Sequence, residues 1–258
     1  MSSAEPPRLL HFRVSHFNEK VRWALDHKRW PHVREAVRPG LHERRIRRLT
    51  GQTKVPVLVL DGEAIAGSAR IIDELERRQP DPPLYPADAA ERTRALAIQQ
   101  HFDDQVAPDV RLLFWSTYVA DSAATARVLA DGFGRGTGLL YRATVPILRA
   151  RFRKNIGLDA VNIAGARDRL AGHFDRLERA LGPSAFLVGD RFTVADLAAA
   201  AILTAIVRPP QFSYPIPEPW SPGLVELRRS VEHRAGFRWV LETYARHRGG
   251  SAEITPPR

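Results

Sequence analysis

The stretch from Lys54 to Leu75 constrains the fold more than any other part of the chain, because its pattern predicts strand, turn, strand and helix in close succession. Val57 to Leu60 is apolar and largely β-branched, which is typical of a buried strand. Asp61-Gly62 predicts a tight hairpin turn, so Glu63 to Ala66 is expected to return antiparallel. Ser68 is then expected to cap a helix.

The residues before this stretch predict a parallel strand–helix–strand unit. Arg8 to Val14 has the pattern of a short strand, and Val21 and Leu25 give the following segment an apolar helical face that ends near His27. His32 to Val37 alternates apolar and polar residues, as a second strand does. The N-terminal part is therefore expected to be a small mixed sheet with helices on its faces.

A proline-rich segment separates this part from the rest of the chain. Gln79 to Pro86 contains Pro80, Pro82 and Pro83 and predicts a stiff extended linker. We expect an α/β domain over residues 1–78, a linker over 79–88 and an all-α domain over 89–258.

Helical periodicity dominates the second domain. Ala89 to Val119 is predicted as one long helix with a possible kink at Pro108, and Gly132 to Gly138 as a flexible loop. Thr193 and Asp196 form a capping-box pattern before Leu197 to Val207, which is apolar on all sides and should be a buried helix.

Composition excludes several classes of protein. The chain of 258 residues has no cysteine, so disulfides, thiolate metal sites and cysteine nucleophiles are excluded, and its histidines show no metal-ligand spacing. No apolar run is long enough to span a membrane and no secretory signal is present, so a cytoplasmic protein is expected. The net charge of +10 is spread widely, apart from a cluster of Arg44, Arg45, Arg47 and Arg48 that suits an anionic ligand.

Four motifs in order resemble the soluble glutathione transferase superfamily, and they span nearly the whole chain. The motifs are Ser15-His16-Phe17-Asn18-Glu19-Lys20-Val21-Arg22-Trp23-Ala24-Leu25, Thr53-Lys54-Val55-Pro56-Val57-Leu58, Gly67-Ser68-Ala69-Arg70-Ile71-Ile72 and Phe192-Thr193-Val194-Ala195-Asp196-Leu197. The resemblance implies a thioredoxin-like first domain, an all-α helical second domain, a cis Val55–Pro56 bond and a homodimer. It also implies glutathione as co-substrate and a hydrophobic electrophile as second substrate.

The resemblance makes Ser15 the first candidate for catalysis. A hydroxyl at a helix N-terminus can donate a hydrogen bond to a thiolate and lower the thiol pKa. Asn18, one helical turn later, is the alternative partner for the thiol. The local sequence alone favours Ser15 as a simple helix cap, and the family resemblance reverses that preference.

The expected glutathione-binding residues come from two of the motifs. Lys54, Val55 and Pro56 would pair with the cysteinyl part as an added strand, although Val55 could also be an ordinary sheet edge. Ser68 would bind the γ-glutamyl carboxylate at a helix N-terminus, or merely cap that helix. Gly67 departs from the Glu or Gln that relatives carry there; Arg44, Arg45, Arg48 or Lys54 are considered as compensating cations for the glycyl carboxylate.

The second substrate is expected between the domains, beside Phe114, Trp115 and Tyr118 and with Phe133 from the glycine-rich loop, although aromatic residues at this spacing also suit a core. Three functions remain open at this point. The chain could conjugate glutathione or a related thiol to a hydrophobic electrophile. It could also be a non-catalytic binding module of the same fold, as Gly67 and the long segment around residues 120–155 favour. Binding of nucleic acid through the arginine cluster has no motif to support it.

Overall fold

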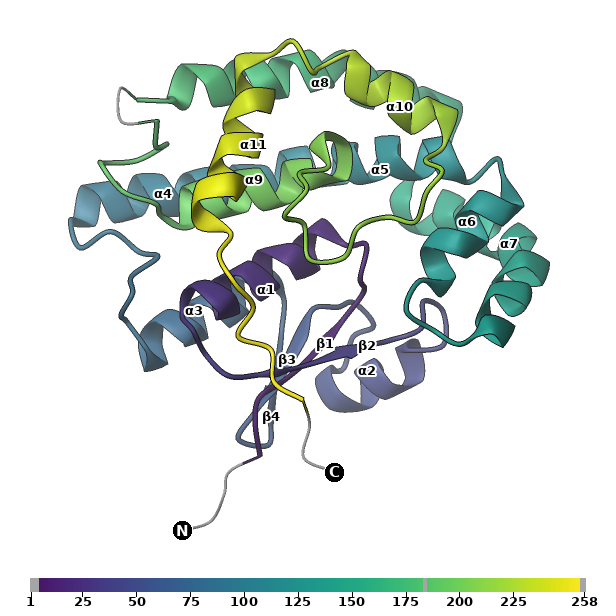
Figure 1. Cartoon of the computed structure of the whole chain (residues 1–258), viewed down its shortest axis with the longest axis horizontal. Coiled ribbons are helices and arrows are strands. Elements are labelled where there is room, and N and C mark those ends of the chain that lie inside the picture. Colours follow the sequence, from purple (N-terminus) through teal and green to yellow (C-terminus); the bar gives the residue numbers. More distant parts are fainter. Residues whose placement is uncertain (1–4, 183–184, 256–258) are drawn as a thin grey trace.

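The computed structural model describes residues 5–182 and 185–255 and places a small sheet below a stack of helices (Figure 1). The sheet has four strands in the order β2-β1-β3-β4. Their bounds are β1 Arg8–His11, β2 Val33–Ala36, β3 Val57–Leu60 and β4 Glu63–Ala66. β1 and β2 are parallel and β3 runs antiparallel to β4, as the pattern predicts. β3 also runs antiparallel to β1, which the pattern does not specify.

The two faces of the sheet pack against different helices. Leu9 and Leu58 are paired between β1 and β3 and belong to the main core, as do the inner residues of α1 (His16–His27) and α3 (Ser68–Arg78). The next pair, Leu10 and Val57, lies on the opposite face with Ile46 of α2 (Glu43–Thr50). This alternation follows from the two-residue period of a strand.

The junction between β4 and α3 corrects one expectation. Gly67, not Ser68, is the N-cap residue of α3, and Ser68 is already the first helical residue. Gly67 has φ +95°, a conformation that costs a side-chain-bearing residue about 1–3 kcal/mol. The backbone at this corner therefore explains why the chain has glycine there.

The remaining helices follow a segment without helix or strand over residues 79–88. Their bounds are α4 Ala89–His101, α5 Ala107–Tyr118, α6 Ser122–Ala130, α7 Arg135–Ile156, α8 Ala160–Ala180, α9 Val194–Val207, α10 Pro222–Arg229 and α11 Ala235–His247. None of the helices within the described residues is long and apolar enough to cross a membrane.

The prediction of a single long helix over Ala89 to Val119 is wrong. A π-helical turn, η1 (Phe102–Val106), separates α4 from α5, and Pro108 lies in the first turn of α5. Proline has no N–H to offer to the carbonyl four residues earlier, so the regular α-helical bonding changes at this point. Asp103 and Asp104 lie within this π-turn.

The predicted glycine-rich loop is also too long. α7 begins at Arg135, so Gly136 and Gly138 are helical, and Pro146 lies inside α7 without ending it. α6 and α7 form a helical pair at the right of Figure 1. The pair contacts the sheet side, because Tyr141 Oη donates to the carbonyl of Pro39 at 2.9 Å and Arg13 Nε to Asp131 Oδ2 at 2.7 Å.

α9 is the central helix, and all its residues are buried, as its composition predicts. Thr193 and Asp196 form the predicted capping box at its start. α9 packs on α1. α11 also contacts α1, since the ring centroids of Tyr244 and Trp23 lie 4.3 Å apart. The tail after α11 returns to the sheet side, because the Ile254 N–H donates to the carbonyl of His32 at 2.8 Å. The sequence after Gly250 predicts a tail from Ser251 to Arg258, of which residues 256–258 lie outside the described residues.

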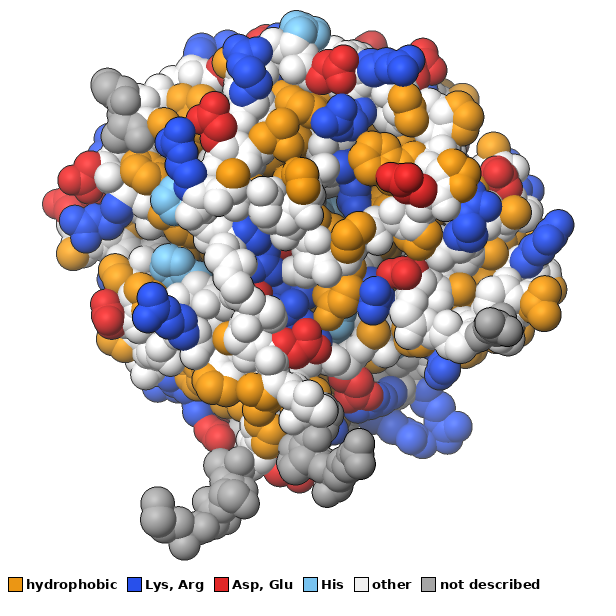
Figure 2. Space-filling model, viewed as in Figure 1, with side chains coloured by type: hydrophobic (Ala, Val, Ile, Leu, Met, Phe, Trp, Pro, Cys, Tyr) orange, Lys and Arg blue, Asp and Glu red, His pale blue; other side chains and the backbone are white. Residues whose placement is uncertain are grey.

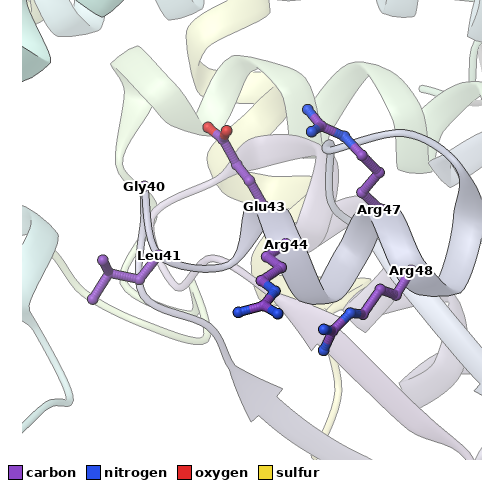
Figure 3. Close-up of a pocket in the computed structure, with 6 residues that line it drawn as sticks. All are labelled: Gly40, Leu41, Glu43, Arg44, Arg47 and Arg48. Carbon is purple, nitrogen blue, oxygen red and sulfur yellow. The ribbon is translucent and has the colours of Figure 1, made fainter.

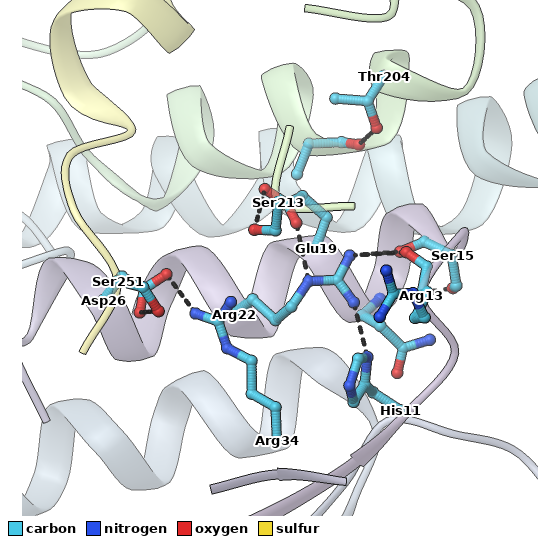
Figure 4. A network of polar contacts seen from close by, with 12 residues as sticks. His11, Arg13, Ser15, Glu19, Arg22, Asp26, Arg34, Thr204, Ser213 and Ser251 are labelled. Carbon is cyan, nitrogen blue, oxygen red and sulfur yellow. Dashed lines mark hydrogen bonds and ion pairs between the residues drawn. The ribbon is translucent and has the colours of Figure 1, made fainter. Parts of the chain in front are cut away.

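A buried network of charges fixes α1 to that tail (Figure 4). Arg22 and Arg248 both donate to Glu19, at 2.8 Å and 2.7 Å, and all three side chains are at most 4% exposed. Arg248 also pairs with Asp26 at 2.8 Å. These cations lower the pKa of Glu19 despite its burial.

Candidate functional site

A cleft of about 1040 Å³ lies between the sheet side and the helices. Its lower wall comes from the turns before α1 and β3 and from the first residue of α3, represented by Ser15, Val55 and Ser68. Its upper wall comes from η1, α5 and α7. The cleft thus combines segments that are far apart in the chain.

Ser15 is the N-cap residue of α1 and lines the cleft. Its Oγ accepts a long hydrogen bond of 3.5 Å from the Asn18 N–H. The hydroxyl proton is therefore not used by this contact, and the positive end of the α1 dipole lies beside it. The site can hold an anion and donate a hydrogen bond to it.

Asn18, the alternative thiol partner, does not line the cleft. Its side chain is 0% exposed, and no described residue bonds its amide oxygen or nitrogen. The position one helical turn after Ser15 belongs to the face of α1 that packs against the core. This placement favours Ser15.

Lys54, Val55 and Pro56 all line the cleft, and the Val55–Pro56 bond is cis. Among the described residues, no hydrogen bond involves the N–H or C=O of Val55. Val55 precedes β3, an internal strand, so the alternative of an ordinary sheet edge is wrong. Its unpaired backbone faces the cleft and can pair with an extended peptide there.

Gly67 and Ser68 line the cleft where α3 begins. Ser68 is 6% exposed, and the amides of the first turn of α3 lie beside it. A Cβ added at Gly67 would meet nothing within 4 Å, so the absent side chain leaves open space. Helix-terminal amides and a hydroxyl suit a carboxylate.

The upper wall is aromatic. Phe114 and Trp115 of α5 line the cleft, and the Trp115 ring lies 4.9 Å from that of Phe152 on α7. Tyr118 does not line it: the residue is 1% exposed and packs 5.0 Å from Phe114 inside the core. Phe133 is also absent from the wall and packs against Arg38.

The arginine cluster lies outside the cleft. Arg44, Arg47 and Arg48 line a shallow hollow on the outer side of α2 (Figure 3), and Arg45 pairs with Glu35. Figure 2 shows basic side chains gathered at the lower right, where Figure 1 places α2. Of the cations considered for the glycyl carboxylate, Lys54 alone lines the cleft.

Sequence reasoning missed several charged and polar residues of the cleft. These are His16, Glu43, Arg70, Asp103, Asp104, Arg111 and Arg151. Burial lowers the pKa of His16 to about 3, so its ring is neutral at physiological pH. Arg111 precedes Phe114 and Trp115 by three and four positions on α5, and this spacing could have suggested a shared helix face.

The described residues contain no group of three or more His, Asp or Glu side chains that could bind a metal ion.

Comparisons with known proteins agree with this architecture. The family model described as "Glutathione S-transferase, N-terminal domain" matches residues 9–83, and "Glutathione S-transferase, C-terminal domain" matches residues 159–229. A curated relative, FtsZ-localized protein A of Caulobacter vibrioides, is 27% identical over 202 residues, which cover 77% of this chain and 76% of the relative.

Solved structures show the same fold. A glutathione S-transferase from Methylobacterium radiotolerans in complex with glutathione sulfonate has a TM-score of 0.54 at 24% identity, covering 91% of this chain and 94% of its own. One from Methylobacillus flagellatus with glutathione bound has a TM-score of 0.50 at 20% identity, covering 91% and 98%. Because the two family models match in order and together cover more than half of the sequence, the chain belongs to the glutathione S-transferase superfamily.

Proposed function

We propose that the chain binds glutathione in the cleft and conjugates it to a hydrophobic electrophile, with Ser15 stabilising the thiolate. The observation that carries this proposal is the presence of Ser15, Val55 and Ser68 on the walls of one cleft. Solved relatives hold glutathione or its sulfonate, which supports the choice of thiol.

Each part of the tripeptide has a complementary surface. The unpaired backbone of Val55 suits the cysteinyl unit, and Ser68 with the first amides of α3 suits the γ-glutamyl carboxylate. Lys54 suits the glycyl carboxylate by its charge. Gly67 supplies no side chain for the glutamyl amine, so we expect weaker binding than in a relative with Glu or Gln there.

The reaction follows from this placement. The thiol loses its proton to solvent, and the Ser15 hydroxyl donates a hydrogen bond to the sulfur anion, which lowers the thiol pKa. The sulfur then attacks the electrophilic carbon, the new C–S bond forms, and the leaving group departs with its electron pair. The aromatic wall of Phe114 and Trp115 would hold the electrophile beside the sulfur. A homodimer would accord with the family resemblance.

Turnover with a chlorodinitrobenzene electrophile tests this role of Ser15. We expect Ser15→Ala to lower kcat by about 10²-fold, the usual effect of removing one donor to a developing anion. The ultraviolet absorbance of bound thiolate should then appear only at higher pH. Ser116→Ala is the matched control, because the Ser116 hydroxyl donates to the Leu113 carbonyl and does not line the cleft. Unchanged kcat and thiolate pKa in Ser15→Ala would exclude the role.

A second candidate is a non-catalytic binding protein of the same fold. The similarity to FtsZ-localized protein A favours it, since that name gives a localisation and no reaction. The glycine at position 67 points the same way. This candidate predicts a stably folded chain that neither binds glutathione nor turns over any common electrophile.

A further inference from the structure

Arg111 differs from the arginines that are largely buried. Arg22, Arg34 and Arg248 each pair with a carboxylate of Glu19 or Asp26. Arg208, like Arg111, has no carboxylate partner among the described residues, but it donates to the Thr204 carbonyl at 3.3 Å and lies over the Phe212 ring. Within residues 5–182 and 185–255, the Arg111 guanidinium has no hydrogen bond or ion pair, and its Nε is buried without a partner. Burial is also the sole cause that lowers the Arg111 pKa, because no carboxylate lies close enough to raise it. The side chain is half-buried and lines the cleft, so a guanidinium without an anion from this chain is available to an anion that enters the cleft.

Arg111 lies where the second substrate would bind. It lines the cleft together with Phe114 and Trp115, which follow it on the same face of α5. His16 lines the same cleft, is 5% exposed, and has a buried Nε2 with no partner among the described residues. A planar guanidinium, a neutral imidazole and an aromatic wall therefore meet in one part of the molecule.

The remaining charges of the cleft leave it positive. Glu43 pairs with Arg151, and Asp103 pairs with Lys20. Lys54, Arg70 and Arg111 are then opposed by Asp104 alone. Lys54 and Arg70 belong to the lower wall, where the thiol is expected, so Arg111 is the cation left for the second substrate.

We propose that Arg111 makes the second-substrate pocket selective for electrophiles that carry a carboxylate on an aromatic or other apolar body. This inference rests on the proposed function for the identity of the pocket. The guanidinium would bind the carboxylate through paired N–H donors, and His16 Nε2, in the tautomer that carries a proton there, would donate a further bond. The apolar body would pack on Phe114 and Trp115.

Binding of an unreactive ligand pair tests the proposal without requiring turnover or glutathione. The probes are 3,5-dinitrobenzoate and its methyl ester, which differ in charge but keep the aromatic ring and lack a leaving group. Calorimetry on the full chain should show the acid binding about tenfold or more tightly than the ester, the usual value of a hydrogen-bonded charge. Equal affinities, or tighter binding of the ester, would overturn the proposal.

Substitution then assigns the preference to one residue. In Arg111→Leu and in Arg111→Gln the ratio of acid to ester affinity should fall to about one, and Arg111→Lys should keep part of it, since lysine offers a point charge without the planar donor pair. Arg153→Leu removes an exposed arginine of α7 that does not line the cleft and should leave the ratio as in the native chain. Circular dichroism identifies any variant that fails to fold, and the native comparison needs no variant.

Glutathione titrations separate this inference from the proposed function. If Arg111→Leu lost glutathione affinity as well, the guanidinium would belong to the glutathione subsite and the inference would be wrong. If the native chain bound no glutathione but kept the acid preference and lost it in Arg111→Leu, the proposed function would fail while the anion site stood. Turnover of 4-chloro-3,5-dinitrobenzoate should exceed that of its methyl ester in kcat/KM by the same factor as the binding.

Discussion

Lys20 Nζ lies 2.6 Å from Asp103 Oδ2, and this contact joins α1 of the sheet side to the π-turn η1 of the helical side. The Lys20 side chain is 0% exposed and that of Asp103 is 13% exposed. Burial lowers the Lys20 pKa and raises the Asp103 pKa, so each charge depends on the other. Because Asp103 also lines the cleft, the pair fixes the position of the upper wall of the cleft relative to α1.

Breaking this pair should destabilise the chain strongly. Lys20→Met leaves a mostly buried carboxylate unpaired, which usually costs about 3–5 kcal/mol of unfolding free energy. The double variant Lys20→Met/Asp103→Leu should recover most of that loss, because no charge remains buried. Urea unfolding measures both.

An exposed ion pair provides the control for this experiment. Arg246 and Glu242 lie 3.4 Å apart with side chains 64% and 56% exposed, and Arg246→Met should change stability by less than about 1 kcal/mol. A loss in Lys20→Met no larger than in Arg246→Met would contradict the structural role of the pair.

Removing the capping box of α9 should lower stability less than breaking the Lys20–Asp103 pair. Thr193 Oγ1 accepts the Ala195 N–H at 3.2 Å and Asp196 accepts the Thr193 N–H at 2.9 Å. Thr193→Ala should lower the free energy of unfolding by about 1 kcal/mol, since it leaves the Ala195 N–H at the start of the helix without its side-chain acceptor. Thr93→Ala, at an exposed position in the first half of α4, is the control, since the Thr93 hydroxyl bonds only the Ala89 carbonyl of its own helix. Equal losses would show that the box contributes nothing.

His16 predicts a pH dependence of stability. Its pKa is lowered from 6.5 to about 3 in the folded chain by burial and by Arg111, so below pH 6.5 the unfolded chain binds a proton that the folded chain does not. Stability should therefore fall with decreasing pH across the window between these two values, by about 1.4 kcal/mol from pH 7.5 to pH 5.5.

The variant His16→Gln isolates this contribution, because other buried histidines remain in both proteins. Its unfolding free energy should fall less steeply than that of the native chain between pH 7.5 and pH 5.5, by about the same 1.4 kcal/mol. Parallel pH profiles for the two proteins would mean that His16 titrates normally.

A side chain at position 67 should lower the stability of the chain and raise its affinity for glutathione. Gly67→Gln should lower unfolding free energy by about 1–3 kcal/mol, because the backbone has φ +95°, but should tighten glutathione binding by contacting the glutamyl amine. The added side chain has room, since nothing lies within 4 Å of its Cβ position. Gly67→Ala separates the effects, because it carries the strain without the amide. If both variants bound glutathione equally, the glutamyl amine would lie elsewhere.

Local signals predicted much of the fold. Asp61-Gly62 specified a hairpin, and Thr193 with Asp196 specified a helix start, because the side chains that stabilise these features lie within a few residues. Local sequence also predicts a loop at Gly136 and Gly138, and that prediction is wrong. Glycine lowers helix propensity, but α7 packs along α6, and tertiary packing outweighs a local preference.

The cleft was harder to predict, because it depends on which way each helix faces. Ser15 and Val55 were found through motifs, whereas Arg111 was not, since nothing local distinguishes an arginine that faces a cleft from one that faces solvent. The prominent cluster of Arg44, Arg47 and Arg48 lies on the outer side of α2, because Ile46 turns the opposite side of that helix toward the sheet.

Calorimetric titration of the full chain with glutathione, repeated on Ser68→Ala, tests the central proposal most directly. We expect binding in the native chain and a loss of about tenfold or more in the variant, because the proposal has the Ser68 hydroxyl donate to the γ-glutamyl carboxylate at the start of α3. Ser116→Ala should bind as the native chain does. No binding by the native chain at several millimolar glutathione would contradict the proposal and favour the non-catalytic candidate.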